Sequence, residues 1–220
     1  DACHAITLKD NPNDPTPIIA GNVSFYNESK NGPIPPSPIV SCLGRFKNVN
    51  KAVPAHFQNN DSVILLIGER KNELGGSVYY SLKNELGANV PKPNFEEVKN
   101  QIFALTDCID SGLVLSCHDI ADGGIASALA EMTFTNSIGC NVNIESNLSP
   151  DKILFSETGG FILEVLPKNI DTIKSVFSNY ELDVFEIGST GGESIQINGI
   201  ADIFVSETKK AWTNGLREKL

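Results

Sequence analysis

The sequence predicts an α+β fold, in which helices pack on a mixed β-sheet. Short apolar runs that read as strands alternate with amphipathic stretches that read as helices. The apolar run Ser62–Ile67 is continuous, which is typical of a strand buried on both faces. Asn198-Gly199 lies between two apolar runs and predicts a hairpin, because both turn positions of such a loop need positive φ.

The first elements of the predicted domain follow the Ser62–Ile67 strand. A loop with the Gly75-Gly76 turn leads to a short helix at Val78–Asn84 and a Pro-rich link. The next helix begins after Asn94, a good N-cap, and ends before Gly112, a good helix stop. Its apolar positions recur at spacings of three and four residues: Phe95, Val98, Ile102, Leu105 and Ile109.

The remaining elements continue the alternation of strands and helices to the end of the chain. Strands are predicted at 113–115, 140–144, 161–166, 182–187, 194–197 and 200–204. Helices are predicted at 125–133, along the apolar face Ile170, Ile173 and Phe177, and at 207–216. Because a hairpin interrupts the alternation, we expect a mixed sheet in one α+β domain over residues 69–220. Residues 1–68 are rich in loops and prolines, and we expect them to be the tail of a preceding domain.

Composition excludes several classes of protein. The net charge of −10 argues against nonspecific binding to nucleic acid or anionic membranes, which requires basic patches. No apolar run approaches the roughly 20 residues that span a bilayer. The cysteines are five in number, widely spaced and without a Cys-x-x-Cys pair, which predicts reduced thiols in a cytoplasmic protein rather than disulfides or zinc. Cys117 and His118 do not form a nucleophile–base pair, because neighbours on a strand point to opposite faces.

The segment Ser116–Ile125 carries the densest set of polar and glycine residues. A strand leads into it and a helix leads out, and His118, Asp119 and Asp122 precede Gly123-Gly124. This arrangement suits a phosphate site, because glycine allows close approach and helix-start amides face an anion. Asp119 or Asp122 would then hold a Mg²⁺. The alternative is a tight strand-to-helix connection with no ligand, since the motif matches neither G-x-G-x-x-G nor the Walker pattern.

Two further motifs allow both a functional and a structural interpretation. In the segment 21–24, Asn22 offers an amide oxygen suited to a hard cation, but Gly-Asn is also a common turn dipeptide. Gly75-Gly76-Ser77 suits an anion nest, or else a helix entry with Ser77 as N-cap, and we favour the N-cap.

Four segments together resemble one family of enzymes. They are Pro17–Glu28, Gly68–Tyr79, His118–Gly124 and Leu154–Gly160, and they occur in the family in this order and spacing. The chain resembles the C-terminal portion of the synthetase subunit of phosphoribosylformylglycinamidine synthase, within the superfamily of aminoimidazole ribonucleotide (AIR) synthetase. The resemblance implies the end of an AIR synthetase N-terminal-like, ATP-binding domain over 1–68. It implies an AIR synthetase C-terminal-like domain over 69–220.

The resemblance also implies roles for individual residues. Gly21 corresponds to an ATP contact, Asn22 to a Mg²⁺ ligand and Ser24 to a substrate contact. Asp119 corresponds to a Mg²⁺ ligand of the enzyme's long form, and Gly123 and Gly124, which we expect to bind nucleotide phosphate, belong to a turn that the wider superfamily shares. In the long form of the enzyme a Ser near this Asp touches an auxiliary nucleotide, and this chain has Ala121 there.

Two further implications concern residues without a catalytic role. The segment Ser156–Gly159 matches a substrate-binding segment of the family's other half, and we expect it to be structural here. The family's catalytic His falls outside this chain, so no catalytic residue is assigned.

The activity implied is an ATP- and Mg²⁺-dependent C–N ligation in purine biosynthesis. The enzyme converts formylglycinamide ribonucleotide and ammonia to formylglycinamidine ribonucleotide through an iminophosphate. The implied partners are a glutaminase, a small accessory subunit and the remaining N-terminal part of the synthetase, with neither nucleic acid nor membrane. Two alternatives stay open: a non-catalytic structural fragment, and a sister enzyme such as AIR synthetase. We expect the isolated 220 residues to be inactive.

Overall fold

The computed structural model describes residues 1–22, 27–34, 38–46, 48–197 and 199–215, and these form two compact units, Asp1–Ala52 and Val53–Leu220. Each unit is described by itself. Within the described residues, no helix is both long enough and apolar enough to cross a membrane.

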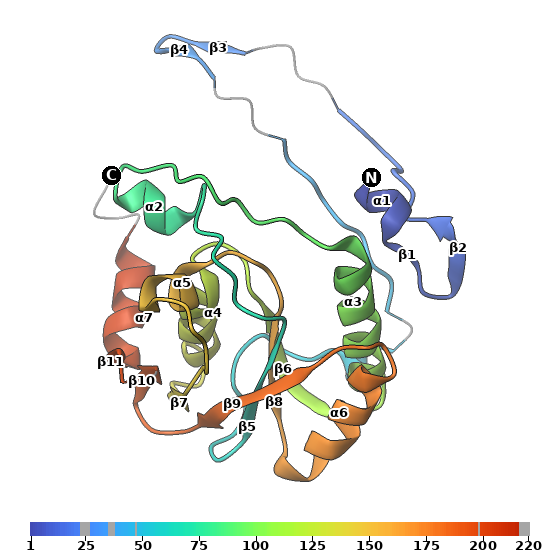
Figure 1. Cartoon of the computed structure of the whole chain (residues 1–220), viewed down its shortest axis with the longest axis vertical. Helices are drawn as coiled ribbons and strands as arrows, with labels where there is room; N and C mark the ends of the chain where they lie inside the picture. Colours follow the sequence, from blue (N-terminus) through green and yellow to red (C-terminus); the bar gives the residue numbers. More distant parts are fainter. Residues whose placement is uncertain (23–26, 35–37, 47, 198, 216–220) are drawn as a thin grey trace. The chain divides into compact units, whose positions relative to one another are not determined.

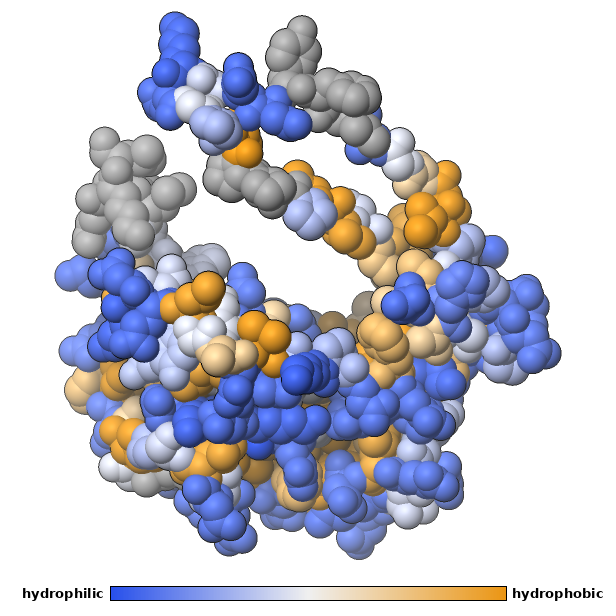
Figure 2. Space-filling view, turned by 45° about the horizontal axis from the view of Figure 1, so that its top comes forward, coloured by the Kyte–Doolittle hydropathy of each residue, from blue (hydrophilic) through white to orange (hydrophobic). Residues whose placement is uncertain are grey.

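The first unit consists of short elements without a core. Two small antiparallel pairs and two helical turns make it up: α1 (Ala2–Ala5), β1 (Thr7–Leu8), β2 (Asn11–Pro15), β3 (Glu28–Ser29), β4 (Gly32–Pro33) and η1 (Val49–Lys51). None of its described residues is buried. The apolar side chains of Ile18, Ile19, Ile39 and Val40 are exposed, and Figure 2 shows hydrophobic side chains along the extended segments of this unit.

The second unit is built on one mixed seven-stranded sheet (Figure 1), as predicted. Its strand order is β11-β10-β7-β9-β5-β8-β6. Among the described strands, only β7 and β10 pair in parallel, and the other pairs are antiparallel. The strand bounds are β5 (Val63–Ile67), β6 (Val114–Asp119), β7 (Cys140–Val142), β8 (Phe161–Val165), β9 (Val184–Thr190), β10 (Ser194–Ile197) and β11 (Ala201–Phe204).

Helices cover both faces of this sheet (Figure 1). One face carries α3 (Phe95–Asp110) and α6 (Ile170–Ser178), and the other carries α4 (Gly124–Thr133), α5 (Pro150–Phe155) and α7 (Val205–Asn214). Along β5 the side chains alternate between two separate cores: Ile64 and Leu66 belong to the α4 side, and Leu65 and Ile67 to the α3 side. The continuous apolar run predicted a strand buried on both faces, and this is confirmed.

The division of the chain falls earlier than the expected boundary at residues 68 and 69. β5 pairs with β8 over its whole length and with β9 on its other side, so it is a central strand of the second unit. The segment 53–68 therefore lies in the second unit, and Val63–Ile67 belongs to its sheet.

Local sequence signals explain where several helices begin and end. The side chain of Asn94 accepts hydrogen bonds from the backbone N–H groups of Glu96 and Glu97, which caps α3 as predicted. Gly112 follows α3 with φ 69°, the left-handed conformation that ends many helices. The short helix α2 (Val78–Leu82) begins after Ser77, whose side chain accepts from the N–H of Tyr80, so the N-cap interpretation is confirmed.

Two features of the second unit depart from the sequence-based elements. β6 continues to Asp119, where the sequence suggested a turn beginning at Ser116. The α5 helix was not predicted, because its six residues are too few to show a helical period.

Candidate functional site

Three of the motifs that carry the resemblance meet in the second unit. They are the loop Gly68–Tyr79 after β5, the turn His118–Gly124 after β6, and the segment Ser156–Gly160 between α5 and β8. We call these residues the motif junction. The segment Ser156–Gly160 contacts both of the other motifs through hydrogen bonds, as the following paragraphs describe.

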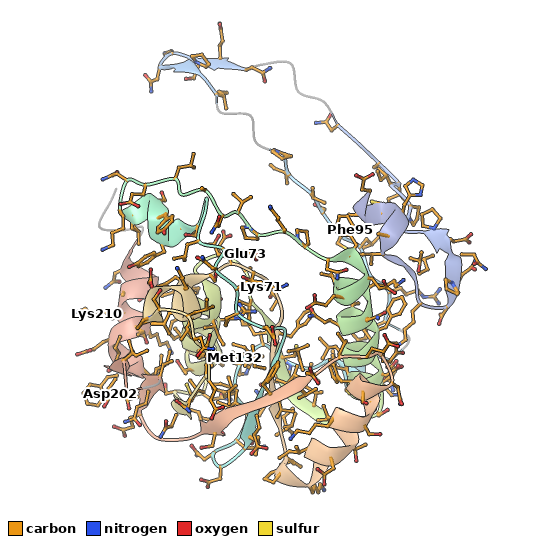
Figure 3. All side chains as sticks on the ribbon, viewed as in Figure 1. Lys71, Glu73, Phe95, Met132, Asp202 and Lys210 are labelled. Carbon is orange, nitrogen blue, oxygen red and sulfur yellow. The ribbon has the colours of Figure 1, made fainter. Side chains whose placement is uncertain are left out.

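Ser156 ties the third motif to the first. Its hydroxyl donates to the backbone oxygen of Lys71 at 2.5 Å and accepts from the N–H of Glu73 at 3.2 Å. Ser156 is fully buried, so these bonds are shielded from water. Lys71 and Glu73 are labelled in Figure 3, on the segment that leads from β5 toward α2.

Arg70 reinforces the same connection from the first motif. Its guanidinium donates to the backbone oxygens of Ser156, Gly159 and Gly68. The side chain is 8% exposed, and burial lowers the pKa of Arg70 to about 10, an effect that nearby Glu73 partly offsets. A buried cation held by three carbonyl oxygens fixes the path of both loops, because each bond would be costly to leave unmade.

Glu157 joins all three motifs. Its Oε1 accepts from the N–H of Gly123, at the N-cap of α4, and from the N–H of Val78, the first residue of α2. Both distances are 2.9 Å. A carboxylate at the start of a helix is favourable, because the helix dipole leaves partial positive charge there.

The two glycines of the second motif have different local reasons to be glycine. Both have positive φ, 78° for Gly123 and 67° for Gly124. A Cβ on Gly124 would lie 2.6 Å from the backbone oxygen of Leu154, so the start of α4 lies directly against α5. The N–H of Gly124 donates to the oxygen of Ala121. A phosphate at these amides, as predicted from sequence, would have to compete with protein acceptors.

The Gly75-Gly76-Ser77 segment has its amides similarly occupied. The N–H groups of Gly75, Gly76 and Ser77 donate to the backbone oxygens of Asn89, Leu86 and Leu74. The segment is therefore a closed helix-entry loop, in agreement with the N-cap interpretation.

Asp119 lies at the end of β6 with its side chain 66% exposed. The half-buried ring of His118 contacts its backbone oxygen through Nδ1 at 2.7 Å, and its Nε2 lies 3.1 Å from the Glu131 carboxylate. His118 is thus a satisfied structural residue that also orients the end of the strand. Asp122 is exposed on the turn that follows.

A hollow of about 180 Å³ adjoins the motif junction. Its wall includes Asp119, Thr158, Lys71, Lys92 and Gln101. In the part of the chain that the structure describes, no three His, Cys, Asp or Glu side chains gather closely enough to hold a metal ion by themselves. The wall carries three carboxylates, Glu69, Glu97 and Asp119, and two lysines, and a Mg²⁺ there would keep waters and phosphate oxygens as its other ligands.

Two larger hollows, of about 740 and 420 Å³, share Glu69 with this one. The larger is lined by the apolar side chains of Leu66, Val184 and Phe185 among others, and also by Arg70. The loop after β5 is therefore the wall common to all three hollows.

The other predicted site residues lie in the first unit. Gly21 and Asn22 are exposed, and a Cβ on Gly21 would meet nothing within 4 Å. Ser24 lies outside the described residues. The structure thus brings Asp119, Gly123 and Gly124 together in the second unit. Gly21 and Asn22 belong to the first unit.

The thiols offer no nucleophile at the motif junction. All five cysteines are free. Burial, and then the charge of Asp119, raise the pKa of Cys117 to about 12, so the thiol stays protonated. This agrees with the rejection of a Cys117–His118 pair.

Arg70 and Glu157 were missed as members of the site. Neither lies in a spacing that a motif could reveal, because all their backbone partners except Gly68 are more than 30 residues away in sequence. A buried Arg beside a glycine-rich loop is a weak signal without the structure.

The sequence of the chain is similar to a known domain family and to known proteins. The family model for "AIR synthase related protein, C-terminal domain" matches residues 59–198. The curated phosphoribosylformylglycinamidine synthase subunit PurL of Methanothrix thermoacetophila is 35% identical over the whole chain, and that of Thermoplasma volcanium is 36% identical over 91% of it. The chain spans only 30% and 27% of the lengths of these relatives.

Solved structures share the fold. The PurL of Thermotoga maritima complexed with FGAR superposes with a TM-score of 0.64 over 73% of this chain and 30% of that chain, at 17% identity. The same protein complexed with ATP gives 0.59 over 73% and 28%, at 18% identity. These likenesses confirm the α+β fold, and the curated relatives confirm the predicted resemblance to a PurL subunit. The chain therefore belongs to the AIR synthase related family, whose C-terminal domain occupies residues 59–198.

Proposed function

We propose that the chain is part of the ATP-dependent ligase that converts formylglycinamide ribonucleotide and glutamine-derived ammonia to formylglycinamidine ribonucleotide. The identity of 35% to a curated PurL subunit over the whole chain is the observation that carries this proposal. The meeting of three motifs in one junction supports it, because a ligand site requires such a convergence.

The chemistry of the junction suits this reaction. An amide oxygen is a poor leaving group, and phosphorylation by ATP turns it into an iminophosphate from which ammonia displaces phosphate. Such phosphoryl transfer depends on positioning and on neutralising charge more than on a protein nucleophile. The junction offers carboxylates, lysines and fixed backbone turns, and its thiol is inert.

Mg²⁺ and ATP are the proposed cofactors. When bound, the metal would neutralise charge on the phosphates. Asp119 is proposed as a metal ligand of the second unit and Asn22, separately, as a metal ligand of the first, with Gly21 as a contact for ATP and Ser24 as a contact for the ribonucleotide. For Gly123 and Gly124 we propose that they shape the turn that carries Asp119, since their amides already have protein acceptors.

The proposed partners follow from the relatives. A T. maritima structure is named PurLQS, which supports a glutaminase partner, and we propose a small accessory subunit and the remaining part of the synthetase as further partners. The cytoplasm is the proposed compartment, in keeping with five free thiols.

The test is ADP release that depends on formylglycinamide ribonucleotide and ammonia. This chain is mixed with a fragment that supplies the rest of the synthetase, and Asn22→Ala and Asp119→Asn are compared with Asp122→Asn as the matched control. We expect the wild-type mixture and the Asp122→Asn control to be active, and the Asn22→Ala and Asp119→Asn variants to be inactive. Activity that survives both variants would remove the metal assignments but keep the enzyme. Folded, associated fragments with no activity would instead favour a sister synthetase, to be assayed with the AIR synthetase substrate.

A further inference from the structure

We propose that Glu157 is a positioning residue for the reaction proposed above. Its carboxylate fixes the turn Asp119–Gly124, which carries the candidate metal ligand Asp119, against the loop Gly75–Val78 at the start of α2. The inference depends on the proposed function for its consequence, but its structural part can be tested without any ligand.

The first step is the pattern of hydrogen bonds. Glu157 Oε1 accepts from Gly123 and from Val78, each at 2.9 Å. Among the hydrogen bonds of the described residues, no other side chain bonds to both of these loops, and no direct bond joins the two loops. One oxygen atom is therefore the polar link between them.

The second step is that Glu157 itself is held in place. It follows α5, whose last turn packs so closely on the start of α4 that a Cβ on Gly124 would lie 2.8 Å from the backbone of Phe155. The preceding residue, Ser156, is pinned by its hydroxyl to Lys71 and Glu73. On the other side of Glu157, the backbone oxygen of Gly159 accepts from Arg70. The backbone is therefore fixed on both sides, which allows the carboxylate to act as a rigid spacer.

The third step separates the polar link from apolar packing. The ring of Tyr79 stacks on Phe155 with centroids 4.5 Å apart and an interplanar angle of 5°. This stack does not involve the carboxylate, so it should keep α2 near α5 when the carboxylate is removed. Loss of Glu157 should therefore loosen the geometry of the two loops while α2 stays docked and the sheet stays folded.

The fourth step concerns the turn itself. Asp119 and Asp122 lie on the four residues that precede the Gly123 amide, and both side chains are exposed. No other side chain is bonded to the amide of Gly123 among the described residues. Asp119 is also held by the pairing of β6 with β8 and by the bond from the Ile120 N–H to the Gly160 oxygen. The Glu157 bond therefore chiefly limits how far the rest of the turn, which carries Asp122, can move.

The experiment compares Glu157→Ala and Glu157→Gln with the wild-type chain by amide hydrogen exchange. The amide oxygen of Gln can still accept both N–H groups, so this variant keeps the link without the charge. The control is Glu73→Ala, which removes a carboxylate from the same region. In the described part of the chain, the only N–H that donates to the Glu73 carboxylate is that of Lys92, at 3.3 Å, so this carboxylate does not link the two loops.

We expect Glu157→Ala to exchange about fivefold faster or more throughout both 119–124 and 76–80, because a lost cap permits local opening. Glu157→Gln and Glu73→Ala should match the wild-type rates in both loops. Faster exchange in only one loop, or at the Gly123 and Val78 amides alone, would show an ordinary cap and overturn the proposal.

The second readout uses Mn²⁺ as a spectroscopic probe of the Asp119 site. We expect Glu157→Ala to bind Mn²⁺ about fivefold more weakly than wild type at a temperature where both are folded, and Glu157→Gln to bind as wild type. Equal affinity in all three would overturn the positioning role while leaving the metal site. If wild type and Asp119→Asn both fail to bind Mn²⁺, the metal assignment of the proposed function fails, and the exchange rates alone decide the role of Glu157.

Discussion

The carboxylate of Glu164 lies within the sheet, on strand β8, where it is 0% exposed. It accepts from the N–H groups of Gln58 and Asn59 at 2.7 and 2.9 Å and from the Ser116 hydroxyl at 2.8 Å. A buried carboxylate is tolerated only when its lone pairs are used in this way. Glu164 thus anchors the segment before β5 to the sheet.

Glu164→Gln should destabilise the second unit by about 2 kcal/mol, because one acceptor becomes an NH₂ that faces a donor. Urea unfolding gives the difference in free energy. The control Ser116→Ala removes only one donor and should cost about 1 kcal/mol. A Gln variant as stable as wild type would mean that the segment 57–59 rearranges to pair its amides elsewhere.

Gly124 is expected to be intolerant of a side chain for two reasons. Its φ is 67°, and a Cβ would meet the Leu154 oxygen at 2.6 Å, which is backbone and has little freedom to move. We expect Gly124→Ala to cost about 3 kcal/mol, combining left-handed strain with the clash. Gly112→Ala is the matched control, because its φ of 69° is similar but its surroundings are open, and it should cost only about 1 kcal/mol. Equal losses in chemical denaturation would show that the contact with α5 is not tight.

Cys140 should make stability fall at alkaline pH. Burial raises its pKa from 9.0 to about 12, so the folded state favours the protonated thiol. With a raised folded pKa, this contribution is complete below pH 9.0 and is lost as the pH rises toward about 12. The wild type should therefore lose more stability than Cys140→Ala between about pH 8 and pH 11. Parallel slopes for the two proteins in urea unfolding would contradict this, and thiol labelling should reach exposed Cys42 long before Cys140.

At the scale of elements, local signals predicted α3 and its cap well, because Asn94 and the apolar spacing act within one helix. Strands of four or more residues in the second unit were likewise found from apolar runs. The parallel pairing of β7 with β10 could not be predicted from sequence, since the two strands are more than 50 residues apart. The sequence revealed the motifs of the junction. It did not reveal the hydrogen bonds of Glu157 and Arg70, because these join groups that are distant in sequence.

Helix α7 is held to α4 by two contacts that the sequence did not show. Lys209 Nζ donates to the Phe134 oxygen at 2.6 Å, at the C-cap of α4, and the Phe134 and Trp212 rings lie 5.6 Å apart. A cation at a helix C-terminus is favourable. These contacts dock the end of the chain on the core.

Lys209→Met should weaken this docking by about 1 kcal/mol without unfolding the sheet. Trp212 is the single tryptophan, so its fluorescence reports the helix directly. Because Trp212 is already 64% exposed, its emission should shift little, and stronger acrylamide quenching is the expected change. Lys210→Met is the control, because Lys210 is exposed and points away from the core in Figure 3. If both variants keep the wild-type quenching, the Lys209 bond contributes nothing to docking.

At the scale of the whole molecule, the second unit contains every buried side chain of the described residues. Its two cores lie on opposite faces of one sheet, and both are formed by residues from 57 onward. The first unit buries no described residue, so it adds no core of its own. Folding stability should therefore reside in residues 53–220.

A chain limited to residues 53–220 should melt cooperatively within about 3 °C of the full chain, because the stability difference is expected to stay below about 1 kcal/mol. Thermal unfolding followed by circular dichroism makes the comparison. In the full chain, brief trypsin digestion should cut first at exposed Lys9, Lys30 and Arg45 and leave a fragment that retains the sheet. A truncated chain that is unfolded, or that melts more than about 10 °C lower, would mean that the first unit stabilises the sheet through contacts that side-chain burial does not reveal. That result would place the functional residues of both units in one cooperative structure, and Asn22 and Asp119 would then have to be tested as a coupled pair.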